Sequence, residues 1–263
     1  MLEIIIIAVV GTALAGLWDL KTTEVPDHLP FVMIGIGVLY WLINAATTGV
    51  YTSLIISVSV GTLLLAGGLV MYKKGQWGGA DAWILAAVGY MIPVYGGALF
   101  IFPYLMNFAL VAIIYTVVYA LAIGVMNPHL FGLFAKSARK KAWMIITPIV
   151  ALLGSVMTYA VYSSVILQPI IFLLAFASFV SVFFIYAKTV EAHYFTRKIP
   201  AGKLRKGDVL EKGNWVGLSD SEIHKLKSSK KYVTIKDGVR FVPFFAITLV
   251  LTLLYGNLFF VIF

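Results

Sequence analysis

The chain has 263 residues, of which 61% are hydrophobic and only 12% are charged, and its net charge is +9. Soluble domains contain about 25% charged residues, so the composition excludes an ordinary soluble domain and indicates a protein that crosses a membrane several times. There is no Cys, which excludes disulfides, zinc thiolates and cysteine nucleophiles.

Apolar segments follow one another along the whole chain. Most of them approach the ~20 residues that are needed to cross ~30 Å of hydrocarbon. The fourth is short and runs into Pro93 and the pair Gly96-Gly97, which predicts a short helix followed by a break. We therefore expect about eight transmembrane helices, with six to eight as the range. The segments are residues 2–18, 29–46, 50–72, 81–92, 103–126, 143–163, 165–187 and 241–262.

The basic residues are confined to alternate loops. If the N-terminus lies outside, all 20 Lys and Arg residues fall in the inner loops 19–28, 73–80, 127–142 and 188–240. Cytoplasmic loops of membrane proteins are enriched in Lys and Arg, so this pattern predicts the orientation and an even number of spans. The positive charge then faces anionic headgroups, and no motif favours a nucleic-acid partner.

The one sizeable polar stretch is residues 188–240. Ser219-Asp220-Ser221-Glu222 is a capping box that predicts a helix from Glu222 to about Ser229, and residues 232–235 alternate like a strand. The expected fold is therefore an all-α polytopic membrane protein with a small cytoplasmic α+β subdomain. We expect a transmembrane body at 1–187, the subdomain at 188–240 and a final transmembrane helix at 241–263.

Two carboxylates lie at the ends of apolar segments. Asp19 ends the first segment and Asp81 begins the fourth, so the orientation above puts both at the inner edge of the membrane. Aspartyl proteolysis needs such a pair, because one ionised carboxylate takes a proton from water while the other, protonated, hydrogen-bonds the scissile carbonyl. Two carboxylates that share a site hold one proton between them. We therefore predict a catalytic body with Asp19 and Asp81 at its cytoplasmic edge.

Each of these features also has a simpler structural explanation. Asp is a common N-cap, and acids cost less at a membrane edge than at mid-depth. The run Gly78, Gly79, Ala80 before Asp81 lets another backbone approach closely, but small residues serve helix packing throughout membrane proteins. From the residues alone, both explanations stay open.

Two motifs, in order, resemble those of prepilin and preflagellin peptidases. The stretch from Trp18 to Leu29 resembles their first-aspartate segment, in which an apolar helix ends in Asp before a short basic stretch and an aliphatic-Pro pair. Residues 73–82 resemble their second motif, Gly-x-Gly-Asp, with Ala80 in place of the second Gly. Residues 200–245 are similar to the archaeal members. The chain is thus identified as a member of this family of membrane aspartyl proteases.

The resemblance implies an activity and a substrate. It implies removal of a short basic leader from type IV pilin-like or archaellin precursors at the cytoplasmic face, with precursor signal peptides and membrane lipid as partners and neither cofactor nor metal. Bacterial members that also N-methylate their product often carry a Cys tetrad, so the chain without Cys is expected to have no methyltransferase activity. Glu24 and Asp27 are candidate contacts for the basic leader, although solvated loop acids are equally consistent with the sequence.

Two other functions compete with this one. Intramembrane proteases of the presenilin and signal-peptide-peptidase type place both aspartates deeper in their spans, the first in a Tyr-Asp context, whereas Asp19 follows Trp18 and precedes Lys21 at an edge. A transporter that uses two acids for ion coupling would favour internal repeats and charges at mid-membrane, and the sequence shows neither.

Overall fold

The computed structural model describes residues 1–163, 165–205, 207–211 and 217–262. By their contacts they divide into two compact units, Met1–Tyr115 with Lys198–Phe263, and Thr116–Arg197. Within the described residues, six helices are long and apolar enough to cross a membrane. The fold is therefore that of a multi-pass, mostly helical membrane protein, as the composition predicts.

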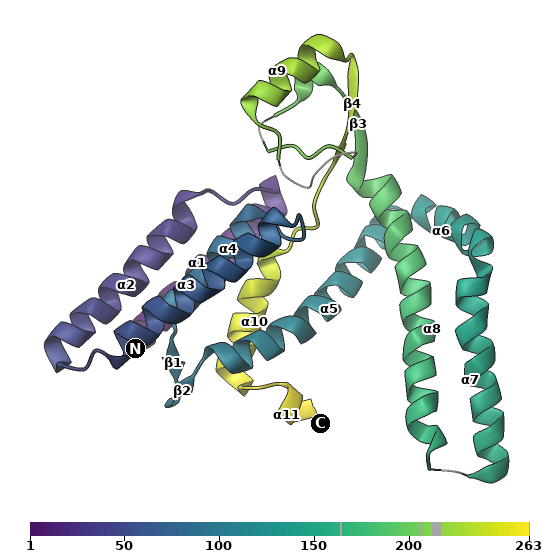
Figure 1. The fold of residues 1–263 in the computed structure, drawn as a ribbon, viewed down its shortest axis with the longest axis horizontal. Coiled ribbons are helices and arrows are strands. Elements are labelled where there is room, and N and C mark those ends of the chain that lie inside the picture. Colours follow the sequence, from purple (N-terminus) through teal and green to yellow (C-terminus); the bar gives the residue numbers. More distant parts are fainter. Residues whose placement is uncertain (164, 206, 212–216, 263) are drawn as a thin grey trace. The chain divides into compact units, whose positions relative to one another are not determined.

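The first unit has α4 at its centre. This short helix packs against α1, α2, α3 and α10, and Figure 1 shows α3 and α4 running along each other. Its closest neighbour is α3, because Gly68 of α3 lets the backbone of Ala82 in α4 come very near. The elements of this unit are α1 (Leu2–Thr22), α2 (His28–Thr48), α3 (Thr52–Lys73), α4 (Gly79–Met91), β1 (Val94–Tyr95), β2 (Ala98–Leu99), the first part of α5 (Ile101–Met126), a 3-10 turn (Ala201–Lys203), α9 (Asp220–Ser229), β4 (Tyr232–Lys236), α10 (Val242–Tyr255) and α11 (Phe259–Ile262).

Two of the expected spans are short helices in the structure. α4 stops at Met91 because the residue before Pro93 is pushed out of the helical region, and a β1–β2 hairpin with positive φ at Gly96 and Gly97 follows. α10 stops at Tyr255 because Gly256 takes a positive φ of 68°. The prediction of one continuous segment over 241–262 is therefore wrong, since a separate helix, α11, begins at Phe259.

The polar stretch has a small core of its own. Ser219 donates its backbone N–H to Glu222 at 2.8 Å, which confirms the predicted capping box, although α9 begins at Asp220 rather than Glu222. β4 lies in a two-stranded sheet with β3 (Thr196–Pro200). The side chains that these elements bury together are Ala201, Leu204, Leu218, Ile223, Val233 and Ile235.

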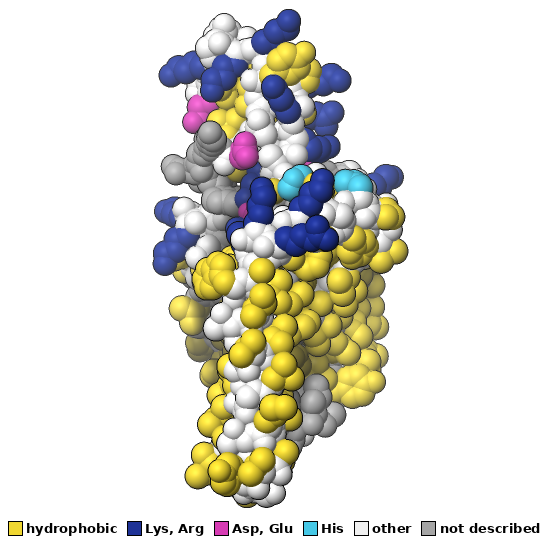
Figure 2. All heavy atoms as spheres, turned by 90° about the vertical axis from the view of Figure 1, so that its right-hand side faces the viewer, with side chains coloured by type: hydrophobic (Ala, Val, Ile, Leu, Met, Phe, Trp, Pro, Cys, Tyr) yellow, Lys and Arg dark blue, Asp and Glu magenta, His cyan; other side chains and the backbone are white. Residues whose placement is uncertain are grey.

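The second unit contains the last part of α5, α6 (His129–Lys140), α7 (Ala142–Tyr162), α8 (Leu167–Val190) and a π-helical turn (Glu191–Phe195). The sequence did not predict α6, which packs its aromatic side chains around Tyr186 of α8. α7 and α8 pack along each other, and none of the side chains of α7 is buried. Figure 2, which faces this unit, shows hydrophobic side chains along the helices, as a surface in contact with lipid requires.

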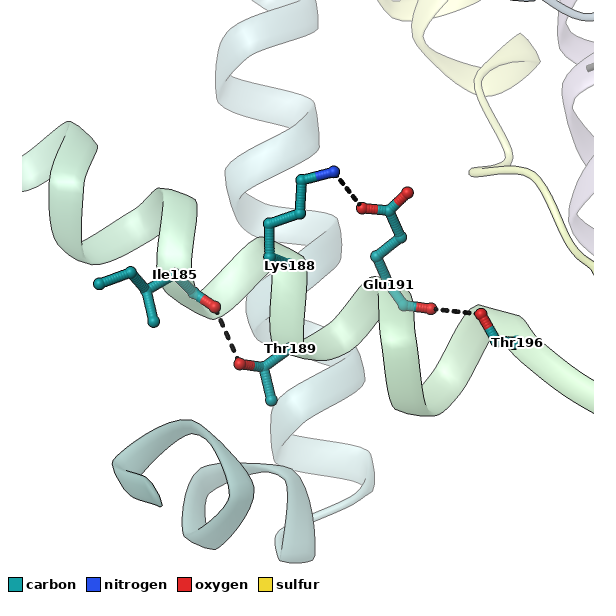
Figure 3. Close-up of polar contacts among 5 residues, drawn as sticks. All are labelled: Ile185, Lys188, Thr189, Glu191 and Thr196. Carbon is teal, nitrogen blue, oxygen red and sulfur yellow. Dashed lines mark hydrogen bonds and ion pairs between the residues drawn. The ribbon is translucent and has the colours of Figure 1, made fainter. Parts of the chain in front are cut away.

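The end of α8 is tied by local polar contacts, shown in Figure 3. Lys188 pairs with Glu191 at 2.7 Å, and the Thr196 hydroxyl donates to the Glu191 carbonyl at 3.1 Å. These contacts join the last turn of α8 to the π-helical turn and to the start of β3. The domain boundaries at 187 and 240 that are expected from the sequence separate membrane-spanning from cytoplasmic residues, and they do not coincide with the two compact units. These boundaries stay a prediction.

Candidate functional site

Asp19 lies in the last turn of α1, buried to 7% exposure. Its Oδ2 accepts the backbone N–H of Val242 at 3.2 Å. Val242 is the first residue of α10, so this N–H has no partner within its own helix and points out of the helix end. The N-terminal end of a helix favours a negative charge, and the Asp19 carboxylate lies at the N-terminal end of α10.

Asp81 has the matching arrangement on α4. It is the third residue of this helix and is buried to 6% exposure. Its Oδ2 accepts the backbone N–H of Gly78, the N-cap residue, at 2.8 Å. Each carboxylate is thus bonded through Oδ2 to a backbone N–H at the start of a short helix, α10 for Asp19 and α4 for Asp81.

Asp19 and Asp81 lie on two helices that pack against each other. α1 packs against both α4 and α10, and the charge of Asp19 is close enough to act on Asp81. Burial makes ionisation of both groups costly, since neighbouring like charges in a medium of low dielectric constant repel strongly. Such a pair favours a single shared proton, which leaves one carboxylate able to accept a proton and the other able to donate one.

The small residues before Asp81 have separate geometric roles. A Cβ on Gly78 would lie 3.2 Å from Oδ2 of Asp81, so any side chain here would press on the carboxylate. Gly79 begins α4, and a Cβ there would meet the Tyr72 ring at an ordinary 3.7 Å. Ala80 lies within the helix, and its methyl group packs against the main core. Ala is therefore compatible with the local backbone where the motif has its second Gly.

Glu24 and Asp27 lie in the connection between α1 and α2, and both are exposed. Glu24 comes near the polar stretch, where a Cβ on Gly207 would be 3.9 Å from its carboxylate oxygen. The hydrogen bonds of Asp19 and Asp81 described above go to Val242 and Gly78, and neither Glu24 nor Asp27 takes part in them. Among the described residues, no three His, Asp or Glu side chains gather as metal ligands would.

Sequence reasoning did not identify two contributors from the far end of the chain, Arg240 and Val242. Val242 supplies the N–H to Asp19, and the Arg240 guanidinium donates to the carbonyl oxygen of Leu20. A backbone donor leaves no residue-type signal. The available signal was the end of the polar stretch at Arg240, followed by Pro243, a residue favoured in the first turn of a helix.

The match with known proteins covers the helices that carry both acids. Residues 6–125 match the model of the Type IV leader peptidase family, a range that includes α1 from Ile6 and all of α2 to α4. It ends before α6, α7 and α8, the helices of the second unit that add two spans. Neither a curated protein nor a solved structure matches the chain.

Proposed function

We propose that this chain, whose residues 6–125 belong to the Type IV leader peptidase family, removes the short basic leader from pilin-like or archaellin precursors with Asp19 and Asp81 as its catalytic pair. The activity that follows from the family is that of an aspartic-type leader peptidase of the membrane, and its substrates are prepilin-like. Beyond the family's activity, we propose that Asp19 and Asp81 are the catalytic residues, that archaellin precursors are among the substrates, and that cleavage takes place on the cytoplasmic side of the membrane.

The assignment of Asp19 and Asp81 as the catalytic pair rests on the way in which their carboxylates are held by backbone hydrogen bonds. Each has one oxygen bonded to the backbone N–H at the start of a helix, Val242 for Asp19 and Gly78 for Asp81. These bonds limit rotation of both carboxyl groups and direct their remaining lone pairs elsewhere. Buried carboxylates with this constraint are suited to hold a water molecule and a peptide carbonyl between them.

The chemistry then needs only these two groups and a water molecule. The ionised member of the pair takes a proton from water as the oxygen attacks the scissile carbonyl carbon. The protonated member hydrogen-bonds the carbonyl oxygen and stabilises the negative charge that develops on it. Collapse of the tetrahedral intermediate breaks the C–N bond, and a carboxyl proton passes to the leaving amine.

The substrate fits the expected position of the pair. A pilin-like precursor has a basic leader followed by an apolar helix. The helix enters the bilayer while the leader remains among the headgroups at the cytoplasmic face, so the bond between them lies at the depth of the interface. Asp19 lies in the last turn of α1 close to Lys21, and Asp81 lies in the first turn of α4 shortly after Lys73 and Lys74, which supports the same depth for the carboxylates.

The direct test is cleavage by the purified full chain in detergent. A precursor with a basic leader and an apolar helix is expected to lose its leader, which gel electrophoresis detects as a shift in size. A matched precursor whose leader is unchanged but whose helix carries polar substitutions is expected to be cleaved slowly, because it does not enter the apolar surroundings of the site. Complete resistance of the unmodified precursor would contradict the proposed function.

Glu24 and Asp27 give a test of leader recognition. If these exposed acids bind the basic leader, Glu24→Gln and Asp27→Asn are expected to raise KM by about two- to fivefold each, because exposed ion pairs contribute about 0.2–1 kcal/mol. The value of kcat is expected to stay the same, since neither acid contacts the reacting groups. The effect should weaken in high salt. Unchanged KM values at low salt would remove both residues from the account.

The orientation can be tested with single cysteines, because the chain has none of its own. Ser228 in α9 and Thr48 at the end of α2 are both exposed. In intact cells, a membrane-impermeant maleimide is expected to label Thr48→Cys and to label Ser228→Cys only after the membrane is opened. The reverse pattern would place Asp19 and Asp81 outside and would contradict cleavage at the cytoplasmic face.

A further inference from the structure

Arg240 lies where the polar stretch ends, two residues before the helix end on which Asp19 is seated. Its guanidinium donates through Nη1 to the carbonyl oxygen of Leu20, the residue that follows Asp19. The Tyr115 hydroxyl donates to the carbonyl oxygen of Arg240 itself at 2.6 Å. Arg240 is therefore held at its backbone by α5 and at its guanidinium by the last turn of α1.

This contact counteracts an unfavourable position of Asp19. A carboxylate in the last turn of a helix lies near the negative end of the helix dipole, where an anion is disfavoured. The guanidinium of Arg240 is close enough for its charge to act on the Asp19 carboxylate. The carbonyl of Leu20 is one of the last acceptors of α1, and a cation bonded to it also stabilises the helix end.

The end of α1 around Asp19 is thus connected to residues 240–242 by two routes. One is direct, from the Val242 N–H to Oδ2 of Asp19, and the other passes through Leu20 to the Arg240 guanidinium. Both donors come from residues 240–242, outside the part of the chain that matches the family model. The segment that follows the polar stretch therefore completes the surroundings of an acid on the first helix.

We propose that Arg240 is a positioning residue for Asp19: it holds the last turn of α1 so that the carboxylate stays on the Val242 N–H and faces the scissile bond. The proposal rests on the proposed function for its effect on cleavage. Arg240 acts through Leu20 and through its charge, without contact with the substrate. The alternative is a plain helix cap, which would stabilise α1 without any effect on the carboxylate.

Lys21 is the matched control. It is a second cation in the last turn of α1, and its side chain is exposed. Removing either cation takes one positive charge from the same helix end. If the two cations only stabilise the end of α1, Lys21→Ala and Arg240→Ala should have similar effects on kcat. If Arg240 positions Asp19, only Arg240→Ala should lower kcat.

The kinetic arm uses the purified full chain and a precursor with a basic leader. Arg240→Ala is expected to lower kcat about 10- to 100-fold, because a displacement of about 1 Å in a catalytic group has an effect of this size. KM is expected to change by less than about threefold, since the residue does not bind the leader. Arg240→Lys should recover part of the rate, as should millimolar methylguanidinium added to Arg240→Ala. A kcat at the wild-type level in Arg240→Ala, or an equal loss in Lys21→Ala, would overturn the proposal.

A second arm needs no substrate. As the first residue of α10, Val242 has no helical acceptor for its N–H, so the protection of this amide from hydrogen exchange depends on Asp19. Asp19→Ala and Arg240→Ala are both expected to lose that protection, and Lys21→Ala is expected to keep it. An amide that stays protected in Arg240→Ala would overturn the positioning role. If the exchange pattern holds while the wild-type chain cleaves no precursor, the proposed function is contradicted and the positioning of Asp19 is supported.

Discussion

Asn in place of either Asp19 or Asp81 is expected to lower kcat/KM for leader removal by about 10²- to 10⁴-fold, the range that positioned acid–base groups contribute. Asn keeps the shape of the side chain and its acceptor oxygen, so the bonds from Val242 and Gly78 can persist. It cannot accept or donate the transferred proton. Because the pair works as a unit, the double variant is expected to be no slower than the slower single variant.

The control for this result is Asp27→Asn, which removes an exposed carboxylate near Asp19 in sequence. It is expected to leave kcat unchanged. Thermal unfolding of all variants in the same detergent shows whether the fold is kept, and we expect the buried-site variants to unfold no earlier than the wild type, since each loses a buried charge. Substantial cleavage by either Asn variant would show that the carboxylates are not the catalytic pair.

Gly68→Ala is expected to have the second-largest effect. A Cβ at this position would lie 2.7 Å from the Cβ and 2.8 Å from the Cα of Ala82, so the backbone of α4 itself would have to move. Overpacking of this kind costs about 1–3 kcal/mol of stability. Ala82 is the neighbour of Asp81, so the same movement displaces a catalytic carboxylate. A shift of about 1 Å is expected to reduce kcat about 10²-fold.

The adjacent glycine provides the matched control. Gly67 occupies the next position of α3, and a Cβ there meets nothing within 4 Å. Gly67→Ala is expected to keep full activity and to raise stability slightly, because Ala is a better helix former than Gly by about 1 kcal/mol. Thermal unfolding and cleavage rates of the two variants, measured side by side, check both claims. Equal behaviour of Gly67→Ala and Gly68→Ala would contradict the close approach of α3 and α4.

The parts of the fold that depend on local pattern could be predicted from the sequence. The apolar runs predict α1, α2, α3, α5, α7 and α8, and Pro93 with the following glycines predicts the end of α4. The capping box at Ser219 predicts α9 to within two residues. In each case the signal and the structure lie in the same stretch of chain.

Two features of the fold, the helix α6 and the break in the last apolar segment, were not predicted, for different physical reasons. The helix α6 was missed because its apolar side chains alternate with polar ones on a helical period inside a stretch interpreted as a basic loop, and those apolar side chains pack on Tyr186 far along the chain. The break in the last apolar segment was missed because Gly256 and Asn257 interrupt the apolar run only briefly, and Gly also serves packing in membrane helices.

The residues of the candidate site also fall into two groups, those that a local sequence pattern reveals and those that only the fold reveals. Asp19 and Asp81 were found because a carboxylate at the end of an apolar segment is conspicuous. Arg240 and Val242 were not, since their contacts with Asp19 and Leu20 join the two ends of the chain through a backbone N–H and a backbone carbonyl. Only the folded arrangement of α1 against α10 shows that they belong together.

The catalytic side of the account is tested most directly by the mass of the product. The purified chain is incubated with a precursor that has a basic leader and an apolar helix, and mass spectrometry of the released peptide identifies the broken bond. Aspartates at the edge of the membrane, on the ends of α1 and α4, predict a single cut between the leader and the apolar helix. A cut within the apolar helix, as expected of a protease of the presenilin type, or no cut at all, would contradict the account.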